Sequence, residues 1–271
     1  MSEIDDVFER CAAEKRAAFI PFLMAGDPDL GTTPELLRAL AAAGADLIEI
    51  GIPFSDPIAD GPVNQRSATR ALAAGTTVAG ILDAVASVRD DLGAPVVLFT
   101  YFNPIRARGL ELFAEQAAAS GVDGVLCVDL PPEEAEEGYL PALAKNDLDA
   151  IFLLAPTSTT ERMKRVGEVS SGFVYYVSRT GVTGERELLT KTLPKEVKRV
   201  RRKVKLPVAV GFGISTPEQV AAVAELADGV VVGSALVRVV EEGGPDLAKR
   251  LEERARELAA PLFAEPKRRW A

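Results

Sequence analysis

The residue of this sequence best suited to acid–base chemistry is Glu49, a carboxylate inside the apolar segment 47–50. A charged carboxylate that is buried without a partner loses hydration that nothing replaces, so its pKa rises. A carboxyl group with a raised pKa can give and accept a proton near neutral pH, as a general acid or base must. The alternative is a structural acid paired with a buried Arg or Lys, but the nearest basic residues, Arg38 and Arg66, fall on predicted helices. We therefore interpret Glu49 as a functional group.

A second carboxylate, Asp60, ends the loop that follows this segment. On its own, Asp60 before Gly61 is typical of an ordinary turn. A loop that folds back over its strand, however, could hold both acids across one ligand. Partial solvation in the loop is expected to keep Asp60 ionised, whereas the apolar strand favours the neutral form of Glu49. Two carboxylates whose pKa values are pushed apart are typical of divided acid–base roles.

The composition excludes several classes of protein. The chain of 271 residues contains no histidine, which rules out Ser-His-Asp and Cys-His triads and HExxH metalloproteases. Its net charge of −9 argues against nucleic acid and anionic membranes as partners. The two cysteines, Cys11 and Cys127, form no CxxC pair, so neither a zinc site nor a disulfide framework is predicted. No signal peptide or membrane-spanning apolar run is recognised, and we expect a cytoplasmic protein.

The elements that must position these acids alternate between short apolar runs and helical segments. Residues 17–24 form a continuous apolar run, which is typical of a parallel strand covered on both faces. Further strands are predicted at 47–50, 95–101, 124–128, 150–154, 173–177, 207–211 and 229–232. The predicted helices between them include one over 33–43 that is capped by Thr33, and one over 133–146 that is interrupted near Gly138 and Pro141.

Eight strand–helix pairs in 271 residues amount to roughly 34 residues per pair, a length that suits βα repeats. This predicts an α/β protein, a single (β/α)8 TIM barrel over residues 1–271, because a doubly wound sheet usually has fewer strands at this length. An extra N-terminal helix is expected at 4–14, with short extra helices after strands 2 and 8. The loops after the strands of a barrel share one face, and the unusual strand-end residues should gather there: Glu49, Tyr101, Asp129, Tyr175, Gly211, Gly213 and Gly233.

Two glycine motifs at that face predict a phosphate site. Gly211-Phe212-Gly213 follows strand 7 and Gly233-Ser234 follows strand 8, the two loops with which many barrels bind phosphate. Glycines let backbone N–H groups approach an anion closely, and Ser234 is expected to begin a short helix whose positive end favours negative charge. Either motif alone would be read as a turn, so the prediction depends on their combination.

Two further features leave alternatives open. The loop 178–186 combines small polar residues, glycines and arginines, and is either an ordinary connection or a lid that closes over a ligand. Aromatic residues are predicted near the same face, where they either fill the barrel core or contact a flat apolar ligand. They are Phe22, Tyr101, Tyr175 and Phe212.

At these residues the chain resembles the α subunit of tryptophan synthase, nearly from end to end. The motifs that carry the resemblance are Glu49-Ile50-Gly51-Ile52-Pro53-Phe54-Ser55-Asp56-Pro57 with Asp60-Gly61-Pro62, Asn103-Pro104, Ser178-Arg179-Thr180-Gly181-Val182-Thr183-Gly184, Gly211-Phe212-Gly213-Ile214-Ser215 and Gly233-Ser234. The resemblance implies a lyase of tryptophan biosynthesis that cleaves indole-3-glycerol phosphate to indole and glyceraldehyde 3-phosphate, without a cofactor in this subunit. It also implies a β-subunit partner that binds pyridoxal phosphate and receives the indole through a tunnel, in an α2β2 heterotetramer.

The resemblance also assigns roles to individual residues. Glu49 moves protons in the retro-aldol cleavage, Asp60 stabilises positive charge at the indole N–H, and Tyr175 supports them. Substrate-binding positions are Phe22, Tyr101, Cys127, Phe152, Thr183, Gly184, Phe212, Gly213, Gly233 and Ser234. Positions expected to face the partner are Asp56, Asn103, Pro104 and Pro131. The sequence departs from the family at Thr100 and Cys127, where larger aliphatic residues are expected in the pocket.

Three other functions remain open at the level of the sequence. A metal-dependent aldolase could use Asp56, Asp60 and Asp129 as oxygen ligands, although without histidine this would be an unusual site. The barrel could instead bind phosphate ligands and only activate a partner, against which the intact pair of acids argues. It could also be a lyase that releases indole without any partner.

Overall fold

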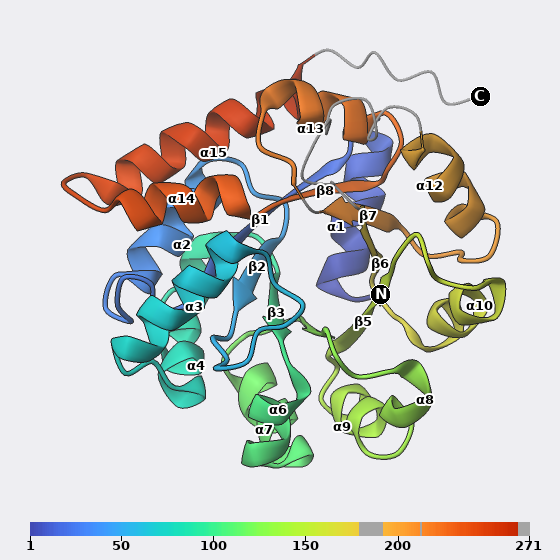
Figure 1. Cartoon of the computed structure of the whole chain (residues 1–271), viewed down its shortest axis with the longest axis horizontal. Helices are drawn as coiled ribbons and strands as arrows, with labels where there is room; N and C mark the ends of the chain where they lie inside the picture. The colour runs from blue at the N-terminus through green and yellow to red at the C-terminus, as the bar shows by residue number, and fades with distance from the viewer. Residues whose placement is uncertain (179–191, 212, 265–271) are drawn as a thin grey trace.

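The computed structural model describes residues 1–178, 192–211 and 213–264. Its eight strands are parallel and form a closed barrel in which the spatial order follows the sequence. Figure 1 shows these strands at the centre with the helices around them. The strands are β1 (Ala18–Met24), β2 (Ile48–Gly51), β3 (Val96–Thr100), β4 (Gly124–Cys127), β5 (Asp149–Leu154), β6 (Val174–Val177), β7 (Val208–Gly211) and β8 (Gly229–Val232). The predicted TIM barrel is confirmed.

The extra helices lie where the sequence predicts them. Helix α1 (Glu3–Ala13) precedes the first strand, α3 (Pro62–Ala73) and α4 (Val78–Ala86) follow β2, and α14 (Ser234–Glu242) follows β8. The other helices are α2 (Thr33–Ala42), α5 (Arg89–Leu92), α6 (Phe102–Arg108), α7 (Leu110–Ala119), α8 (Pro132–Ala135), α9 (Tyr139–Lys145), α10 (Thr160–Val169), α12 (Leu193–Arg201), α13 (Pro217–Ala224) and α15 (Leu247–Phe263). Among the described residues, no helix combines the length and the apolar character needed to cross a membrane.

Two prolines lie in the first turns of helices. Helix α6 follows β3 and includes Pro104 as its third residue. Pro141 lies inside the first turn of α9 and does not interrupt it. Proline is tolerated in a first turn because the N–H groups there have no partner within the helix. The predicted interruption falls at 136–138, before α9, and includes Gly138, whose φ of 103° is readily adopted only by glycine.

Thr33 does not cap its helix. It lies within α2, after the N-cap residue Thr32, whose side chain makes no capping hydrogen bond. Its hydroxyl accepts a hydrogen bond from the Gly26 N–H at 3.0 Å and donates one to the Asp29 carbonyl at 3.2 Å. Thr33 therefore holds the β1–α2 loop together, a role that capping preferences do not predict.

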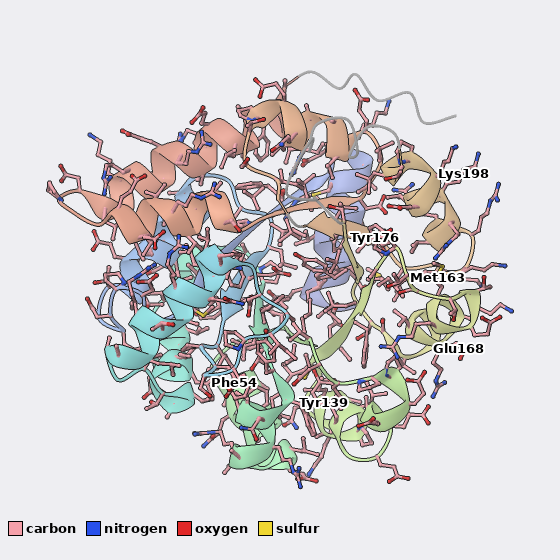
Figure 2. All side chains as sticks on the ribbon, in the orientation of Figure 1. Phe54, Tyr139, Met163, Glu168, Tyr176 and Lys198 are labelled. Carbon is pink, nitrogen blue, oxygen red and sulfur yellow. The ribbon has the colours of Figure 1, made fainter. Side chains whose placement is uncertain are left out.

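Side chains alternate along each strand between the barrel interior and the layer beneath the helices. On β6, Tyr175 belongs to the inner cluster, while Tyr176 lies between β6 and α12 and donates a hydrogen bond to Glu196 at 3.0 Å (Figure 2). The inner cluster comprises Ala18, Ile20, Leu47, Val97, Leu126, Ile151, Phe173, Tyr175, Ala209 and Val231, together with Ile4, Val7, Phe8 and Cys11 of α1. Helix α1 thus closes the N-terminal end of the barrel, and the opposite end is left for a site.

Candidate active site

Glu49 is the most unusual side chain at the open end of the barrel. It lies on β2 beside Phe22 of β1 and Val97 of β3, and only 1% of it is exposed. Neither carboxyl oxygen has a hydrogen-bond partner among the described residues. Burial without any compensating donor raises its pKa from 4.5 to about 8. The raised pKa expected from the apolar strand is therefore found, and Glu49 can carry a proton at neutral pH.

Asp60 occupies a different environment. It is half-buried at the end of the β2–α3 loop, and its Oδ2 accepts a hydrogen bond from the Tyr101 hydroxyl at 2.8 Å. Burial raises the pKa of Asp60, and hydrogen bonds from Tyr101 and Asn64 act in the opposite direction. The expected partial solvation is present, but burial rather than solvation dominates the pKa. The two acids differ because Asp60 has donors and Glu49 has none.

Tyr101 fastens the loop that carries Asp60. Its hydroxyl donates to Asp60 and accepts a hydrogen bond from the Ala59 N–H at 3.0 Å. Its ring packs against Phe54 with the ring centres 5.1 Å apart. The resemblance gives Tyr101 a substrate-binding position, but Tyr101 contacts Asp60 and is not among the residues that line the cavity. The hydroxyl, not the aromatic face, connects it to the site.

Tyr175 reaches the same site from the opposite wall. A Cβ atom at position 211 would overlap its hydroxyl, so Gly211 of β7 makes room for it. Burial raises the pKa of Tyr175 well above its ordinary value, and the nearby charges of Glu49 and Asp60 raise it further. The phenol therefore stays protonated and can act only as a hydrogen-bond donor or acceptor.

One cavity brings Glu49, Asp60 and Tyr175 together. Of the residues expected at the site, Glu49, Asp60, Tyr175, Phe22, Gly213, Gly233 and Ser234 line it. Gly61, Asn64, Phe99 and Val231 also line it and were missed. Strand alternation could have revealed Phe99 and Val231, because both point to the same face as Glu49. We find no comparable signal in the sequence for Asn64.

The predicted phosphate end lies on the same cavity. Gly213 has a φ of 74°, a conformation that favours glycine, and follows β7. Gly233 is the N-cap of α14, so the unpaired N–H groups of that helix begin at Ser234. These groups and the helix dipole favour an anion. The cavity therefore has an apolar side with Phe22 and Phe99, a carboxylate side, and an anion-binding end.

Several other expected site residues lie elsewhere. Cys127 and Phe152 belong to the core between the strands and the helices, and they do not line the cavity. Their neighbours Leu126 and Ile151 are the side chains that point into the barrel. Thr183, Gly184 and Phe212 lie outside the described residues, and so does the candidate lid beyond Ser178.

Asp129 is occupied by local bonds. It accepts a hydrogen bond from the Phe102 N–H at 2.7 Å, at the start of α6. No group of three His, Cys, Asp or Glu side chains with metal-binding geometry occurs in the part of the chain that the structure describes. Asp56, Asp60 and Asp129 therefore do not form the oxygen-ligand site of a metal-dependent aldolase.

A charged network ties the two walls of the cavity to each other. Asp27, which is 1% exposed, accepts hydrogen bonds from Arg70 of α3 at 2.6 and 2.9 Å and one from Ser67. Arg70 also pairs with Glu241 of α14 at 2.9 Å. Helices α3 and α14 lie side by side (Figure 1). Because α3 follows Asp60 and α14 begins at Ser234, the network fixes the acid loop relative to the anion-binding end.

A larger groove lies at the closed end of the barrel, with a volume of about 910 Å³ against about 50 Å³ for the cavity at Glu49. Both of its arginines are already paired: Arg16 with Asp46 at 2.6 Å and Arg201 with Asp228 at 2.7 Å. The smaller cavity contains the unpaired carboxyl, and we assign the active site there on chemistry rather than on size.

The fold is that of a TIM-barrel enzyme, and its open-end cavity combines carboxyl groups with an end suited to an anion. Comparisons with known proteins identify the family, since the model for the tryptophan synthase alpha chain matches residues 8–264. The chain belongs to this family. The prediction from the sequence, a lyase of tryptophan biosynthesis, is confirmed at this level.

Individual relatives match over nearly their whole length. The tryptophan synthase alpha chain of Geotalea daltonii is 52% identical over 266 residues, which cover 97% of this chain and 100% of that protein. That of Burkholderia thailandensis is 51% identical over 92% of each chain. Tryptophan synthase subunit alpha from Legionella pneumophila has a similar structure, with a TM-score of 0.89 and 39% identity over 97% of this chain and 98% of that one. A chain of Mycobacterium tuberculosis tryptophan synthase gives a TM-score of 0.87 at 41% identity, over 96% and 98% of the two chains.

Proposed function

We propose that Glu49, Asp60 and Tyr175 carry out the cleavage of indole-3-glycerol phosphate to indole and glyceraldehyde 3-phosphate. The observation that carries this proposal is the buried Glu49 carboxyl, with a pKa of about 8 and no partner among the described residues. At neutral pH it holds a proton that it can give up, beside Asp60 and Tyr175 in one cavity.

In the proposed mechanism Glu49 acts twice. Its carboxyl gives a proton to indole C3, which becomes tetrahedral and leaves positive charge on the ring nitrogen. The resulting carboxylate takes the proton of the hydroxyl on the carbon attached to C3. The bond between these carbons then breaks, its electron pair returns to the indole ring, and the hydroxyl carbon becomes the aldehyde. Glu49 ends protonated, so the protons balance.

The other residues stabilise charge and bind substrate. Ionised Asp60 lies beside the indole N–H and stabilises the positive charge, and the protonated phenol of Tyr175 supports the two acids. Phe22 contacts the indole ring, while Gly213, Gly233 and Ser234 bind the phosphate. Thr183, Gly184 and Phe212, which lie outside the described residues, remain proposed substrate-binding residues.

We also propose that residues 1–271 form one cytoplasmic domain that needs no metal or cofactor of its own. The mechanism needs no metal or cofactor, because carboxyl groups alone can carry out both of its proton transfers. A β subunit that binds pyridoxal phosphate is the proposed partner, in an α2β2 heterotetramer. The rim beside Asp56 supports a partner there, because it presents Ile58 with 88% of its surface exposed.

The test is an assay of indole release from indole-3-glycerol phosphate, with and without a β subunit. We expect the isolated chain to release indole. Release should be faster in the complex, because a β subunit bound at the rim favours a closed state of the loops around the active site. No release in either condition would refute the proposed function. Restoration of activity by Mg²⁺ or Zn²⁺ after EDTA treatment would refute the cofactor-free mechanism. Sedimentation that finds no complex at micromolar concentration would refute the partnership.

A further inference from the structure

Asn64 stands out among the residues that line the active-site cavity. It is the third residue of α3, four positions after Asp60, and its side chain reaches the cavity from the first turn of that helix. Its Oδ1 atom is buried and has no hydrogen-bond partner among the described residues. A buried amide oxygen without a partner costs free energy, and such groups are rare unless they have a function.

Two buried polar groups that line this cavity have no hydrogen-bond partner among the described residues. They are the Glu49 carboxyl and the Asn64 amide oxygen, and Asp60 lines the same cavity. The Asn64 amide lowers the pKa of Asp60, which places its nitrogen on the side of that acid. The amide oxygen remains an acceptor without a donor.

The substrate can supply the missing donor. Indole-3-glycerol phosphate has three neutral donors: the indole N–H and two glycerol hydroxyls. The proposed function assigns the indole N–H to Asp60 and one hydroxyl proton to Glu49. The phosphate needs donors and provides none. Only the second hydroxyl, on the carbon next to the phosphate-bearing carbon, is left without an acceptor.

We propose that Asn64 is a further substrate-binding residue, whose amide oxygen accepts a hydrogen bond from this second hydroxyl while its amide nitrogen positions Asp60. The inference rests on the proposed function and deepens it. It gives the site a means of selecting a hydroxylated chain between the indole ring and the phosphate. It also couples the acid that stabilises the indole nitrogen to the presence of that chain.

The experiment compares two ligands in a chain that cannot turn over. Asn64→Leu, which keeps the approximate shape but lacks donor and acceptor, is combined with Glu49→Gln. Calorimetry then gives the Kd of indole-3-glycerol phosphate and the Kd of indole-3-propanol phosphate, an analogue that lacks both glycerol hydroxyls. We expect the Kd of the substrate to rise about 3- to 10-fold more than that of the analogue, the effect of one lost hydrogen bond. Thr69→Val, which removes an exposed hydroxyl from the same helix, is the control and should change neither Kd.

A second measurement separates binding from positioning. In the otherwise unaltered chain, Asn64→Leu removes a donor to Asp60, so the acid limb of the kcat/KM profile should move to higher pH. Equal changes in the two Kd values, or no change for the substrate, would overturn the proposed contact with the hydroxyl. If the parent chain releases no indole, the proposed function itself fails, whatever Asn64 does. If it releases indole and the two Kd values move together, only the role of Asn64 fails.

Discussion

Two buried carboxylates stand three residues apart, Asp46 just before β2 and Glu49 within it, and they differ in their hydrogen-bond partners. Glu49 at the open end has no hydrogen-bond partner among the described residues and a pKa of about 8. Asp46 at the closed end accepts hydrogen bonds from Arg16 at 2.6 and 2.8 Å, from Arg10 at 3.0 Å and from the Phe19 N–H at 2.9 Å. Burial alone would raise the pKa of Asp46, but these donors and the Arg16 charge hold it below its ordinary value.

The contrast teaches how one short segment, 46–49, serves stability and chemistry at once. At the closed end both carboxylate oxygens of Asp46 accept hydrogen bonds. The charge of Asp46 therefore fixes α1 and the start of β1 in place. At the open end the absence of donors keeps a proton on Glu49 until a substrate arrives. Barrels commonly divide their two faces in this way. Partners, rather than burial, decide which acid is structural and which is catalytic.

Glu49→Gln should produce the largest effect. The amide keeps the shape but cannot carry the proton, so kcat for indole release should fall by roughly 10²- to 10⁴-fold. Circular dichroism should show an unchanged fold, and substrate should still bind because the anion-binding end is intact. The measurement is steady-state kcat, and turnover within about threefold of the parent would remove Glu49 from the mechanism.

The same variant also tests the pKa. The pKa of Glu49 is about 8 in the folded chain and about 4.5 in the unfolded chain, so the folded state binds the proton more tightly. The stabilising contribution of the protonated group is complete below pH 4.5 and is lost as the pH rises through about 8. Relative to the parent, Glu49→Gln should therefore become more stable across this range in urea unfolding. A difference that does not depend on pH would contradict the raised pKa.

Asp46→Ala should show the opposite pattern, with a loss of stability and little change in catalysis. The substitution leaves the guanidinium of Arg16, whose side chain is 12% exposed, without its buried partner. Breaking a buried pair on one side costs about 3–5 kcal/mol, which denaturant unfolding measures directly. Asp91→Ala breaks an exposed pair with Arg38 and should cost no more than about 1 kcal/mol. A large loss of kcat in folded Asp46→Ala would break the division between the two ends.

Much of this contrast can be read from the sequence, because it depends on local patterns. An acid in an apolar strand identifies Glu49, and the apolar runs give the strands and the barrel. The resemblance places Cys127 and Phe152 in the pocket, but strand alternation directs their neighbours Leu126 and Ile151 into the barrel. A shift of one residue reverses the side to which every side chain points.

The remaining contacts depend on tertiary structure. Arg16 and Asp46 lie 30 positions apart, and nothing in the sequence indicates that they pair. The hydrogen bond from Tyr101 to Asp60 depends on how the β2–α3 loop folds back over the barrel. Asn64 reaches the cavity only because α3 begins directly after that loop. Long-range partners of this kind decide the pKa values of acids, so the sequence predicted the pKa of Glu49 better than that of Asp60.

Gly213→Asp should weaken substrate binding at the open end without changing the chemistry. A carboxylate there would oppose the phosphate, and like charges in contact cost several kcal/mol, so KM should rise about tenfold or more. Gly213→Asn is the matched control, because asparagine has the same shape, carries no charge and tolerates the φ of 74° comparatively well. Equal KM values for the two variants would attribute the effect to backbone strain and place the phosphate elsewhere.

Tyr101→Phe should have the smallest effect and tests whether donors, rather than burial, distinguish Asp60 from Glu49. The variant loses the 2.8 Å hydrogen bond that lowers the pKa of Asp60, so that pKa rises and the acid limb of kcat/KM moves to higher pH. Because one hydrogen bond is lost, kcat/KM should fall about 3- to 10-fold at neutral pH. Tyr139→Phe is the matched control, since Tyr139 is similarly buried on α9 (Figure 2) and its hydroxyl donates to the Val125 carbonyl at 3.4 Å rather than to an acid. If both variants leave the acid limb in place, burial alone sets the pKa of Asp60, and the two acids of the site differ only in degree.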